Sequence, residues 1–347
     1  MQKLEALKEL LATPKKIVIL PHRKPDADAL GSCLAVWNVL TQLGHQATVI
    51  SPTDYPKFLF WMQGHEEVVV FSEKTKPKVE SLVNDADIIF CLDFSGLNRI
   101  EKLEGIIRNA LGKAKFILID HHRGKEEFAD FELWDITASS ASELVHDFIS
   151  LLGYGNLINE AIGECLYAGI MTDTGSFKYP STTGKTHRII ADLIDKGINA
   201  ARIHRLIYDT NSLDRLRFLG FVLNEKLVVH PEYHTAYFSL STSELAKFNS
   251  QTGDTEGIVN YALSLENVVL AALFIEKKEG GTKMSFRSAG DFSVASLAND
   301  HFNGGGHINA AGGGVDDSLA ETIEKFEQLL PTYKDSLKAE FHKKTSK

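Results

Sequence analysis

Histidine and aspartate side chains recur at the ends of apolar segments in the first half of this 347-residue sequence. The first group is His22 with Asp26 and Asp28, which follows the apolar run 16–20. Imidazole nitrogen and carboxylate oxygen are ligands for divalent metals such as Mn²⁺ and Mg²⁺. Because residues two apart in an extended segment project in opposite directions, Asp26 and Asp28 can each serve a different ion. Helix capping by the same two aspartates is the competing interpretation.

Three further groups of this kind follow apolar segments: Asp93, Asp120-His121-His122 and Asp173. The first two end predicted strands, and the carboxyl ends of strands are where open α/β sheets bind ligands. Asp173 closes a predicted helix. Ordinary turns explain each group taken singly, but buried polar residues are costly unless they have partners.

Six side chains together form a candidate two-metal site: His22, Asp26, Asp28, Asp93, His121 and Asp173. The charge of the four carboxylates matches that of two divalent ions, so an anionic substrate is not repelled. Two ions about 3.5–4 Å apart can share a carboxylate and clamp an in-line phosphoryl displacement. The oxygen-rich donor set favours Mn²⁺ or Mg²⁺ over metals that prefer thiolate. Of the remaining residues, Asp120 can orient an imidazole.

A second set of candidate residues lies in the last third of the chain. The run Gly304-Gly305-Gly306 lets backbone N–H groups approach a phosphate closely, and His307 adds another donor. Arg287, followed by Ser288, can hold a phosphate with two hydrogen bonds. Asn260 is a candidate for hydrogen bonding to a base. A flexible glycine loop with an exposed histidine is the alternative.

One other motif is rejected as a phosphate-binding loop. The sequence 183–186 (TGKT) matches the end of that motif, but Tyr179 stands where its first glycine is required, beside Pro180. We expect a helix start here, with Lys185 and His187 exposed to solvent.

Short apolar runs alternate with amphipathic segments through the first half of the chain. This alternation predicts an α/β fold with a mostly parallel sheet and flanking helices. The predicted strands are 16–20, 47–50, 68–71, 87–92 and 116–119. The predicted helices are 30–43, 140–152, 159–170, 186–195, 200–208 and 213–223.

The last third of the chain has the pattern of a smaller α+β domain. Its predicted strands are 234–240, 268–275 and 283–287, and its predicted helices are 294–301 and 319–330, followed by a frayed lysine-rich tail. We expect a metal-binding catalytic domain at 1–190, a helical linker at 191–215 and a substrate-binding domain at 216–347, which lies across a cleft from the first.

Composition limits the classes of partner. The net charge is −9, from 37 basic and 46 acidic residues, which argues against a protein that grips long duplex nucleic acid. We expect no signal peptide and no membrane span, since no run approaches the required ~20 apolar residues. The cysteines Cys33, Cys91 and Cys165 do not form an even disulfide framework, which favours the cytoplasm. The sequence is compatible with a homodimer.

The ordered motifs resemble those of the DHH phosphoesterase superfamily. They are His22 with the segment 25–32 (PDADALGS), then Asp93, Asp120-His121-His122 and Asp173. The segment from Gly304 to Gly312, with Arg287-Ser288 before it, resembles the DHH-associated C-terminal domain. The resemblance covers nearly the whole chain. It departs from the family at Asn303, where a further glycine is common.

The resemblance implies a stand-alone oligoribonuclease (nanoRNase) that also removes phosphate from 3′-phosphoadenosine-5′-phosphate (pAp). It implies two divalent ions, most simply Mn²⁺, with Asp93 shared between them. His122 would contact the scissile phosphate and protonate the leaving oxygen, and Asp120 would hold the motif in place. Arg287 and His307 would grip another part of a short RNA or small nucleotide. The implied ligands are His22, Asp26 and Asp93 for one ion and Asp28, Asp93, His121 and Asp173 for the other.

Two other functions are compatible with the same residues. One is a cyclic-di-AMP or pApA phosphodiesterase, which shares this catalytic domain. The other is an inert nucleotide sensor, which we expect to have lost a metal ligand, whereas all six are present. A family II inorganic pyrophosphatase has a different C-terminal signature, and RecJ-like exonucleases have additional nucleic-acid-binding modules.

Overall fold

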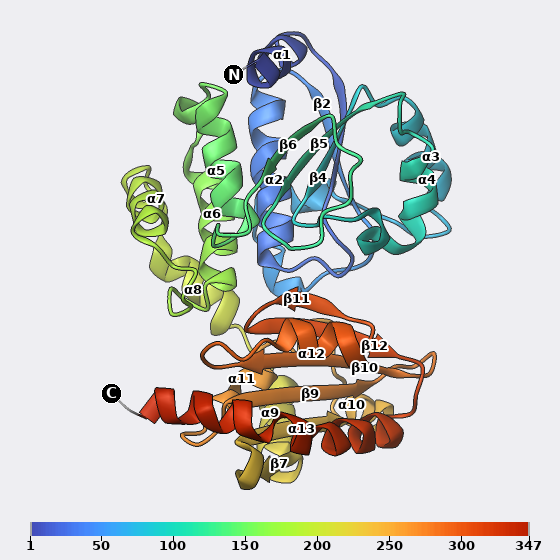
Figure 1. Ribbon diagram of the computed structural model, residues 1–347. Helices are drawn as coiled ribbons and strands as arrows, with labels where there is room; N and C mark the ends of the chain where they lie inside the picture. The colour runs from blue at the N-terminus through green and yellow to red at the C-terminus, as the bar shows by residue number, and fades with distance from the viewer. Residues whose placement is uncertain (1, 346–347) are drawn as a thin grey trace. The chain divides into compact units, whose positions relative to one another are not determined.

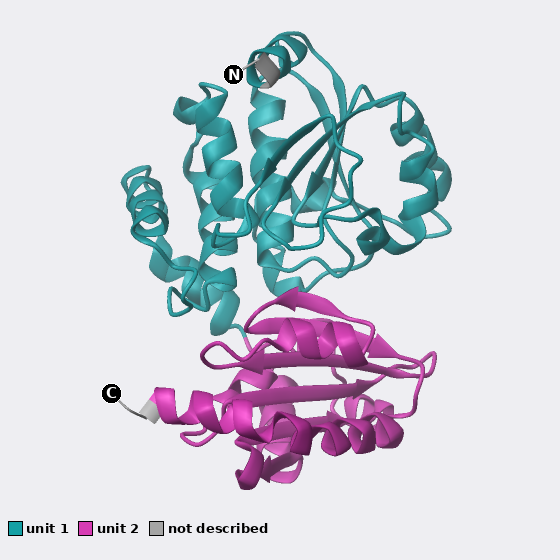
Figure 2. Cartoon of the chain, in the orientation of Figure 1, with its two compact units in different colours: residues 1–210 teal, residues 211–347 magenta. Residues whose placement is uncertain are grey.

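The chain forms two compact units, which meet in the sequence at Thr210 and Asn211 (Figure 2). The structure is a computed structural model that describes residues 2–345. Each unit is built on one six-stranded sheet. The predicted fold class, a mostly parallel α/β domain followed by a smaller second sheet domain, is confirmed.

The sheet of the first unit is entirely parallel, with the order β3-β2-β1-β4-β5-β6. The central strand β4 has the sequence IIFCL and is buried along its whole length, as expected for a sheet covered on both faces. The strand order reverses between β1 and β4, and in such folds ligands bind outside the carboxyl ends of the strands at this point. The strands are β1 (Lys16–Leu20), β2 (Gln46–Ser51), β3 (Val69–Val70), β4 (Ile88–Leu92), β5 (Lys115–Asp120) and β6 (Phe131–Trp134).

Helices cover both faces of this sheet (Figure 1). Helices α2, α5 and α6 pack on one face, and α3 and α4 on the other. The α-helices are α1 (Gln2–Leu11), α2 (Ala27–Gln42), α3 (Lys76–Asn84), α4 (Glu104–Arg108), α5 (Ala141–Leu151), α6 (Glu160–Asp173), α7 (Gly184–Asp195) and α8 (Ala200–Tyr208). Short 3-10 helices are η1 (Lys57–Leu59), η2 (His65–Glu67), η3 (Leu97–Leu103) and η4 (Gly155–Leu157).

The second unit contains a mostly antiparallel sheet with the order β11-β12-β10-β9-β8-β7. Helices α12 and α13 pack on one face, and α9 and α11 on the other. The strands are β7 (Leu227–His230), β8 (Thr235–Leu240), β9 (Leu270–Glu276), β10 (Thr282–Ser288), β11 (Gly305–His307) and β12 (Ala310–Val315). The helices are α9 (Leu213–Glu225), η5 (Pro231–Tyr233), α10 (Thr242–Lys247), α11 (Ile258–Leu263), α12 (Val294–His301) and α13 (Leu319–Thr345).

The segment expected as a helical linker, 191–215, is divided between the two units. Its first part completes α7 and forms α8, whose Ile203 and Ile207 are buried in the core of the first unit. Its last residues begin α9, whose Phe218 and Val222 are buried in the second unit. Each helix therefore belongs to the unit in which its apolar side chains are buried.

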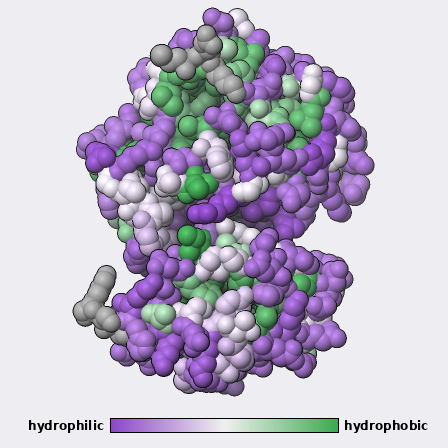
Figure 3. Space-filling view, viewed as in Figure 1, coloured by the Kyte–Doolittle hydropathy of each residue, from purple (hydrophilic) through white to green (hydrophobic). Residues whose placement is uncertain are grey.

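One further detail differs from the sequence prediction. The lysine-rich tail does not fray at Leu337, because α13 continues to Thr345 and Lys343 pairs with Asp291 and Glu340. No helix within residues 2–345 is long and apolar enough to cross a bilayer. The face shown in Figure 3 is mainly hydrophilic, with smaller apolar patches.

Candidate metal centre

The site begins where the strand order reverses. His22 lies two residues after β1 and Asp93 directly after β4, and His22 Nε2 is 3.4 Å from Asp93 Oδ2. Asp93 has a left-handed backbone (φ 64°), which aspartate tolerates better than most residues, and its N–H donates to Ile119 O at 3.0 Å. His22 Nδ1–H donates to Arg23 O at 2.7 Å, so Nε2 is the ring nitrogen that faces Asp93.

Asp26 is compatible with both interpretations of the first motif. It is the N-cap of α2, and its Oδ1 accepts from the N–H groups of Asp28 and Ala29 at 3.0 and 3.1 Å. It also offers a carboxylate oxygen within 4.8 Å of ligand atoms of His22 and Asp93. One carboxylate can therefore cap the helix and bind a cation.

Asp28 also caps a helix, but a different one. Its Oδ2 accepts from Ala141 N–H at 2.7 Å and its Oδ1 from Ser142 N–H at 2.8 Å, at the start of α5. The residue is 1% exposed. Asp28 Oδ2 lies 3.8 Å from His121 Nε2, so the start of α5 fixes this carboxylate beside the histidine.

His121 lies at the end of β5 and faces several carboxylates. Its Nδ1–H donates to Ala138 O at 3.3 Å, so Nε2 is the ring nitrogen that faces the carboxylates. Nε2 lies 3.4 Å from both Asp93 Oδ1 and Asp173 Oδ2. Asp173 closes α6, as the sequence predicted for a ligand from that helix.

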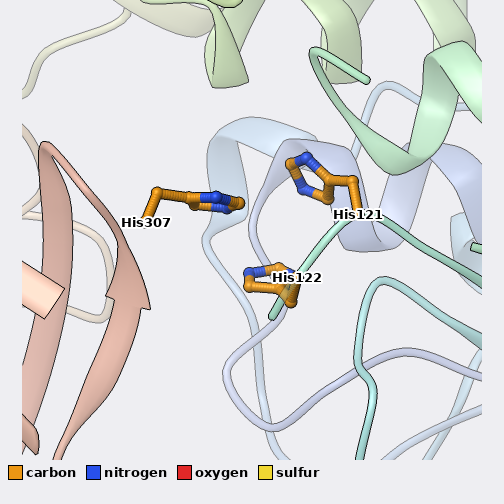
Figure 4. Close-up of side chains that lie close together, drawn as sticks. All are labelled: His121, His122 and His307. Atoms are coloured by element: carbon orange, nitrogen blue, oxygen red, sulfur yellow. The ribbon is translucent and has the colours of Figure 1, made fainter. Parts of the chain in front are cut away.

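The hydrogen-bond partner of the His122 side chain is Asp120. Its ring and that of His121 meet edge to face with centroids 4.8 Å apart (Figure 4). His122 Nδ1 is 2.8 Å from Asp120 Oδ1, and the other oxygen of Asp120 accepts from the Ser95 hydroxyl. Trp134 Nε1–H donates to His122 O at 2.7 Å. Side chains from β6 and from the turn after β4 thus fix the orientation of the Asp120–His122 pair.

The six expected ligands form two groups that can each hold a cation: His22, Asp26 and Asp93, and Asp28, His121 and Asp173. Asp93 Oδ1 is buried and accepts no hydrogen bond within the described residues, although it faces His121 Nε2. Adjacent ligands of an octahedral ion with bonds of about 2.1 Å lie about 3 Å apart. The separations of 3.4 Å at Asp93 are close to this value. The residues therefore fit a pair of divalent ions.

Electrostatics give the clustered carboxylates different properties. Burial alone would raise the pKa of Asp93, but the imidazoles of His121 and His22 hold it well below its usual range. Burial and the charges of Asp93 and Asp173 raise the pKa of Asp28 well above its usual range. Burial raises the pKa of Asp173 to about 6, against the opposing effect of His121. Asp93 is thus the carboxylate that stays ionised most readily.

In the second unit, Arg287 and His307 lie in one row across the sheet. Arg287 on β10 pairs with Ala310 on β12, which pairs with His307 on β11. Paired residues of antiparallel strands project from the same face, so Arg287 and His307 flank a small alanine. Arg287 Nη1–H donates to Phe286 O, and its buried Nε has no partner within the described residues. This donor is available for an anion.

The glycine run does not form the flexible loop that was the alternative interpretation of this segment. Gly305–His307 forms β11 and Ala310–Val315 forms β12. A Cβ on Gly313 would lie 2.6 Å from Phe302 O, and Gly306 has a φ of 143° with Ala310 O at 2.5 Å from its Cβ position. Glycine is therefore needed because the backbones approach closely.

The other two candidates in this unit differ in exposure. Ser288 is 5% exposed, and its hydroxyl donates to Phe292 O at 2.6 Å and accepts from Asn309 Nδ2 at 3.0 Å, so it holds the turn after β10. Asn260 is exposed on α11, a helix that packs on β8, β9 and β10. Asn260 is therefore accessible to a ligand, whereas the hydroxyl of Ser288 is occupied by internal contacts.

Sequence reasoning missed the residues that support the ligands. Ser95 and Trp134 fix the Asp120–His122 pair, and Ala138 fixes His121 through its carbonyl. The one available signal was the pattern Ser140-x-x-Glu143, which marks a helix start. It does not indicate which carboxylate accepts hydrogen bonds from the N–H groups of that helix start.

Known proteins are similar to this chain in both of its units. Residues 16–170 match the DHH family, N-terminal domain, and residues 232–339 match the DHHA1 domain. The chain is 31% identical to the probable bifunctional oligoribonuclease and PAP phosphatase NrnA of Streptococcus mutans, over 93% of this chain and 98% of that protein. The chain belongs to the DHH family. The resemblance inferred from the sequence motifs is confirmed.

The similarity to two further proteins extends over nearly the whole chain. The bifunctional oligoribonuclease and PAP phosphatase NrnA of Thermus thermophilus is 29% identical over 97% of this chain and 95% of its own length. The crystal structure of an exopolyphosphatase-related protein from Bacteroides fragilis superposes with a TM-score of 0.90 at 38% identity, over 97% of this chain and 98% of that one. The similarity therefore includes both units of this DHH protein.

Proposed function

We propose that this protein is a two-metal phosphoesterase that hydrolyses short oligoribonucleotides to mononucleotides and removes phosphate from pAp. The observation that carries the proposal is the position of Asp93, which has His22 Nε2 at 3.4 Å from one oxygen and His121 Nε2 at 3.4 Å from the other. A carboxylate between two sets of ligands can serve both ions of a binuclear site. The names of the similar proteins from S. mutans and T. thermophilus support the choice of substrates.

The ligands divide between the ions as two groups that share Asp93. His22, Asp26 and Asp93 would hold one ion, and Asp28, Asp93, His121 and Asp173 the other. Two bound divalent ions, most simply Mn²⁺, supply Lewis acidity and neutralise charge at the scissile phosphate. Donation of His22 Nδ1–H to Arg23 O and of His121 Nδ1–H to Ala138 O keeps both Nε2 atoms ready to bind metal.

The Asp120–His122 pair has the arrangement of a general acid and its supporting carboxylate. Asp120 accepts Nδ1–H, which fixes the ring and leaves Nε2–H to protonate the leaving oxygen as the P–O bond breaks. The carboxylate balances the positive charge of the imidazolium before transfer. Ser95 holds the second oxygen of Asp120 and so keeps the carboxylate in this orientation.

In the second unit, Arg287 and His307 would bind another phosphate of the substrate, and Asn260 its base. The unpartnered Nε of Arg287 supports this role, because a buried guanidinium N–H without an acceptor is costly in the absence of a ligand. Recognition of a second phosphate in this way would favour short substrates. The glycines at 304–306 would contribute through the close approach of their strands rather than as a phosphate loop.

We place the reaction in the cytoplasm. Cys33, Cys91 and Cys165 are all free and buried, as expected in a reducing compartment. The net charge of −9 supports a small anionic substrate held by local cations rather than a long nucleic acid.

A substrate panel tests this function directly. Purified protein with Mn²⁺, with and without chelator, is incubated with a diribonucleotide, pAp, pApA, cyclic-di-AMP, longer RNA and pyrophosphate, and the products are separated by chromatography. We expect chelator-sensitive turnover that is fastest for the diribonucleotide and pAp. Faster turnover of cyclic-di-AMP or pApA would replace the proposed substrates, and tight nucleotide binding without any turnover in Mn²⁺ would identify a sensor instead.

A further inference from the structure

Two candidate ligands of the second ion depend on one short segment at the start of α5. This segment, residues 138–143, is called the α5 entry segment. Its Ala138 O accepts from His121 Nδ1 at 3.3 Å, and its Ala141 and Ser142 N–H groups donate to Asp28 at 2.7 and 2.8 Å. A shift of its backbone would therefore move both ligands together.

A buried carboxylate in the same segment holds this backbone in place. Glu143 is 2% exposed, and its Oε2 accepts from Ser139 Oγ at 2.5 Å and from Thr186 Oγ1 at 2.9 Å. Its Oε1 pairs with Lys185 Nζ at 3.0 Å. Although Glu143 stands where a capping box would turn it back to the N-cap, its side chain instead joins the entry segment to α7.

The partner residues lie at the start of α7 and are themselves fixed. Thr183 and Thr186 form a capping box there, which holds the Thr186 hydroxyl toward Glu143. Lys185 also pairs with Asp147 on α5 at 2.6 Å. The sequence interpretation of Lys185 as a residue exposed to solvent was incomplete, because its charge joins two helices.

A buried carboxylate is costly unless it is paired and hydrogen-bonded, and Glu143 is both. Its contacts connect α7 to the entry segment, and the entry segment to Asp28 and His121. The other group of ligands is supported elsewhere: His22 by Arg23 O, Asp26 by its helix cap, and Asp93 by Ile119 O. Glu143 therefore bears on only one of the two groups.

We propose that Glu143, anchored by Lys185 and Thr186 of α7, is a positioning residue that selectively maintains the Asp28–His121–Asp173 metal site. This inference rests on the two-metal function proposed above. Glu143 acts through the backbone of the entry segment, and its side-chain hydrogen bonds and ion pair in the described structure are with Ser139, Thr186 and Lys185. Its loss should weaken the binding of one ion, while the His22–Asp26–Asp93 site keeps its affinity for the other.

Three variants test the proposal in the full-length protein: Glu143→Gln, Lys185→Met and, as the matched control, Glu164→Gln. Glu164 is also a poorly exposed glutamate in an ion pair between two helices, with Arg202 at 2.6 Å. It lies about 13 Å along α6 from Asp173. Mn²⁺ binding is measured by titration calorimetry, and the bound ions are examined by electron paramagnetic resonance.

The wild type and Glu164→Gln should each bind two Mn²⁺ and show the spectrum of a spin-coupled pair. In Glu143→Gln the affinity of one ion should fall by about 10–100-fold, as for other residues that orient ligands. The variant with one equivalent of Mn²⁺ should then show the six-line signal of an isolated ion. Lys185→Met should lower the affinity for the same ion by a smaller factor, since Ser139 and Thr186 still hold Glu143. Excess Mn²⁺ should restore kcat in both variants.

Unchanged affinity for both ions in Glu143→Gln, or equal weakening of both, would overturn the proposal. If circular dichroism shows that Glu143→Gln does not fold, Lys185→Met decides, because its side chain is 44% exposed and its replacement leaves no buried charge without hydrogen bonds. Selective loss of one ion, combined with a wild type that binds two ions but hydrolyses no phosphate ester, would support the positioning role and refute the proposed function. The two ideas can therefore fail separately.

Discussion

His122 Nδ1 lies 2.8 Å from Asp120 Oδ1, and the carboxylate of Asp120 is completely buried. A buried carboxylate beside an imidazole fixes both the ring orientation and the position of its proton. The pair stands next to His121, whose Nε2 turns instead toward Asp93 and Asp173. The two adjacent histidines that follow β5 therefore face different carboxylates.

Replacing Asp120 by Asn should lower kcat without releasing metal. The amide cannot balance the imidazolium charge of His122, so we expect a loss of about 10²–10⁴-fold, the range of a general acid. Single-turnover kinetics measure the loss, and calorimetry with Mn²⁺ should show two ions bound with wild-type affinity. The double variant Asp120→Asn/His122→Gln should be no slower than His122→Gln, since the residues act as a unit. Multiplicative losses would show that they act independently.

Replacing Asp93 by Asn should disable both metal sites. Asparagine tolerates the left-handed backbone at this position, so the fold should be kept. The lost charge faces both His22 and His121, and we expect the affinity of both ions to fall by more than about 100-fold, beyond the effect of an outer residue. Mn²⁺ titration and hydrolysis of pAp measure the effect. Substantial turnover by a folded Asp93→Asn protein would contradict a shared ligand.

Removing metal should destabilise the first unit. The four aspartates of the site repel one another, and bound cations relieve that repulsion. At a free Mn²⁺ concentration of 100 times Kd, binding to the folded state alone adds about 2.7 kcal/mol per ion. Thermal unfolding with Mn²⁺ and with chelator should therefore show a higher Tm for the loaded protein, and Asp93→Asn should lose most of the difference. An equal Tm in both conditions would refute the binding of two metal ions at this site.

Asp130 provides a test of acid stability at the opposite end of β5. Burial alone would raise its pKa, but Lys115 Nζ at 2.7 Å and Phe116 N–H at 2.9 Å lower it. A lowered pKa stabilises the fold above the unfolded value of about 3.9, and this contribution is lost as the pH falls below it. Asp130→Asn should lower the free energy of unfolding at pH 7 by no more than about 1 kcal/mol, since the pair is partly exposed. Denaturant titrations should show the difference shrinking as the pH falls below about 3.9.

Replacing Arg287 by Lys should separate substrate binding from chemistry. Lysine cannot form the two parallel hydrogen bonds that guanidinium offers to a phosphate. We expect KM for pAp to rise about tenfold, equivalent to about 1.4 kcal/mol, with a smaller change in kcat. Steady-state kinetics with pAp measure both values, and Mn²⁺ affinity serves as the control. A loss confined to kcat would argue against a role in binding.

The ends of the buried strands could be predicted because parallel strands have continuous apolar runs. β4 is one such run, so the position of Asp93 at the sheet edge followed from its neighbours in sequence. The dual use of Asp26 was open between cap and ligand, and the structure shows the cap together with a suitable position for the ligand.

Other elements depend on contacts between distant residues. β6 has the half-exposed sequence FELW, too short to distinguish from a loop, and its strand character comes from pairing with β5. The glycines of β12 have low strand propensity, but Gly313 packs against Phe302 where a larger residue would clash. The link from Glu143 to Lys185 spans two helices, and helical periodicity does not specify it.

The proposed double role of Asp26 and Asp28, as metal ligands and as helix caps, affects how loss of activity would be recognised in this family. Both carboxylates cap helices, so a pseudoenzyme descended from such a protein would retain them for folding alone. Asp173 caps no helix among residues 2–345, and the contact that orients it is with His121. Decay of catalysis should therefore appear first at the end of α6, while the most recognisable part of the motif persists.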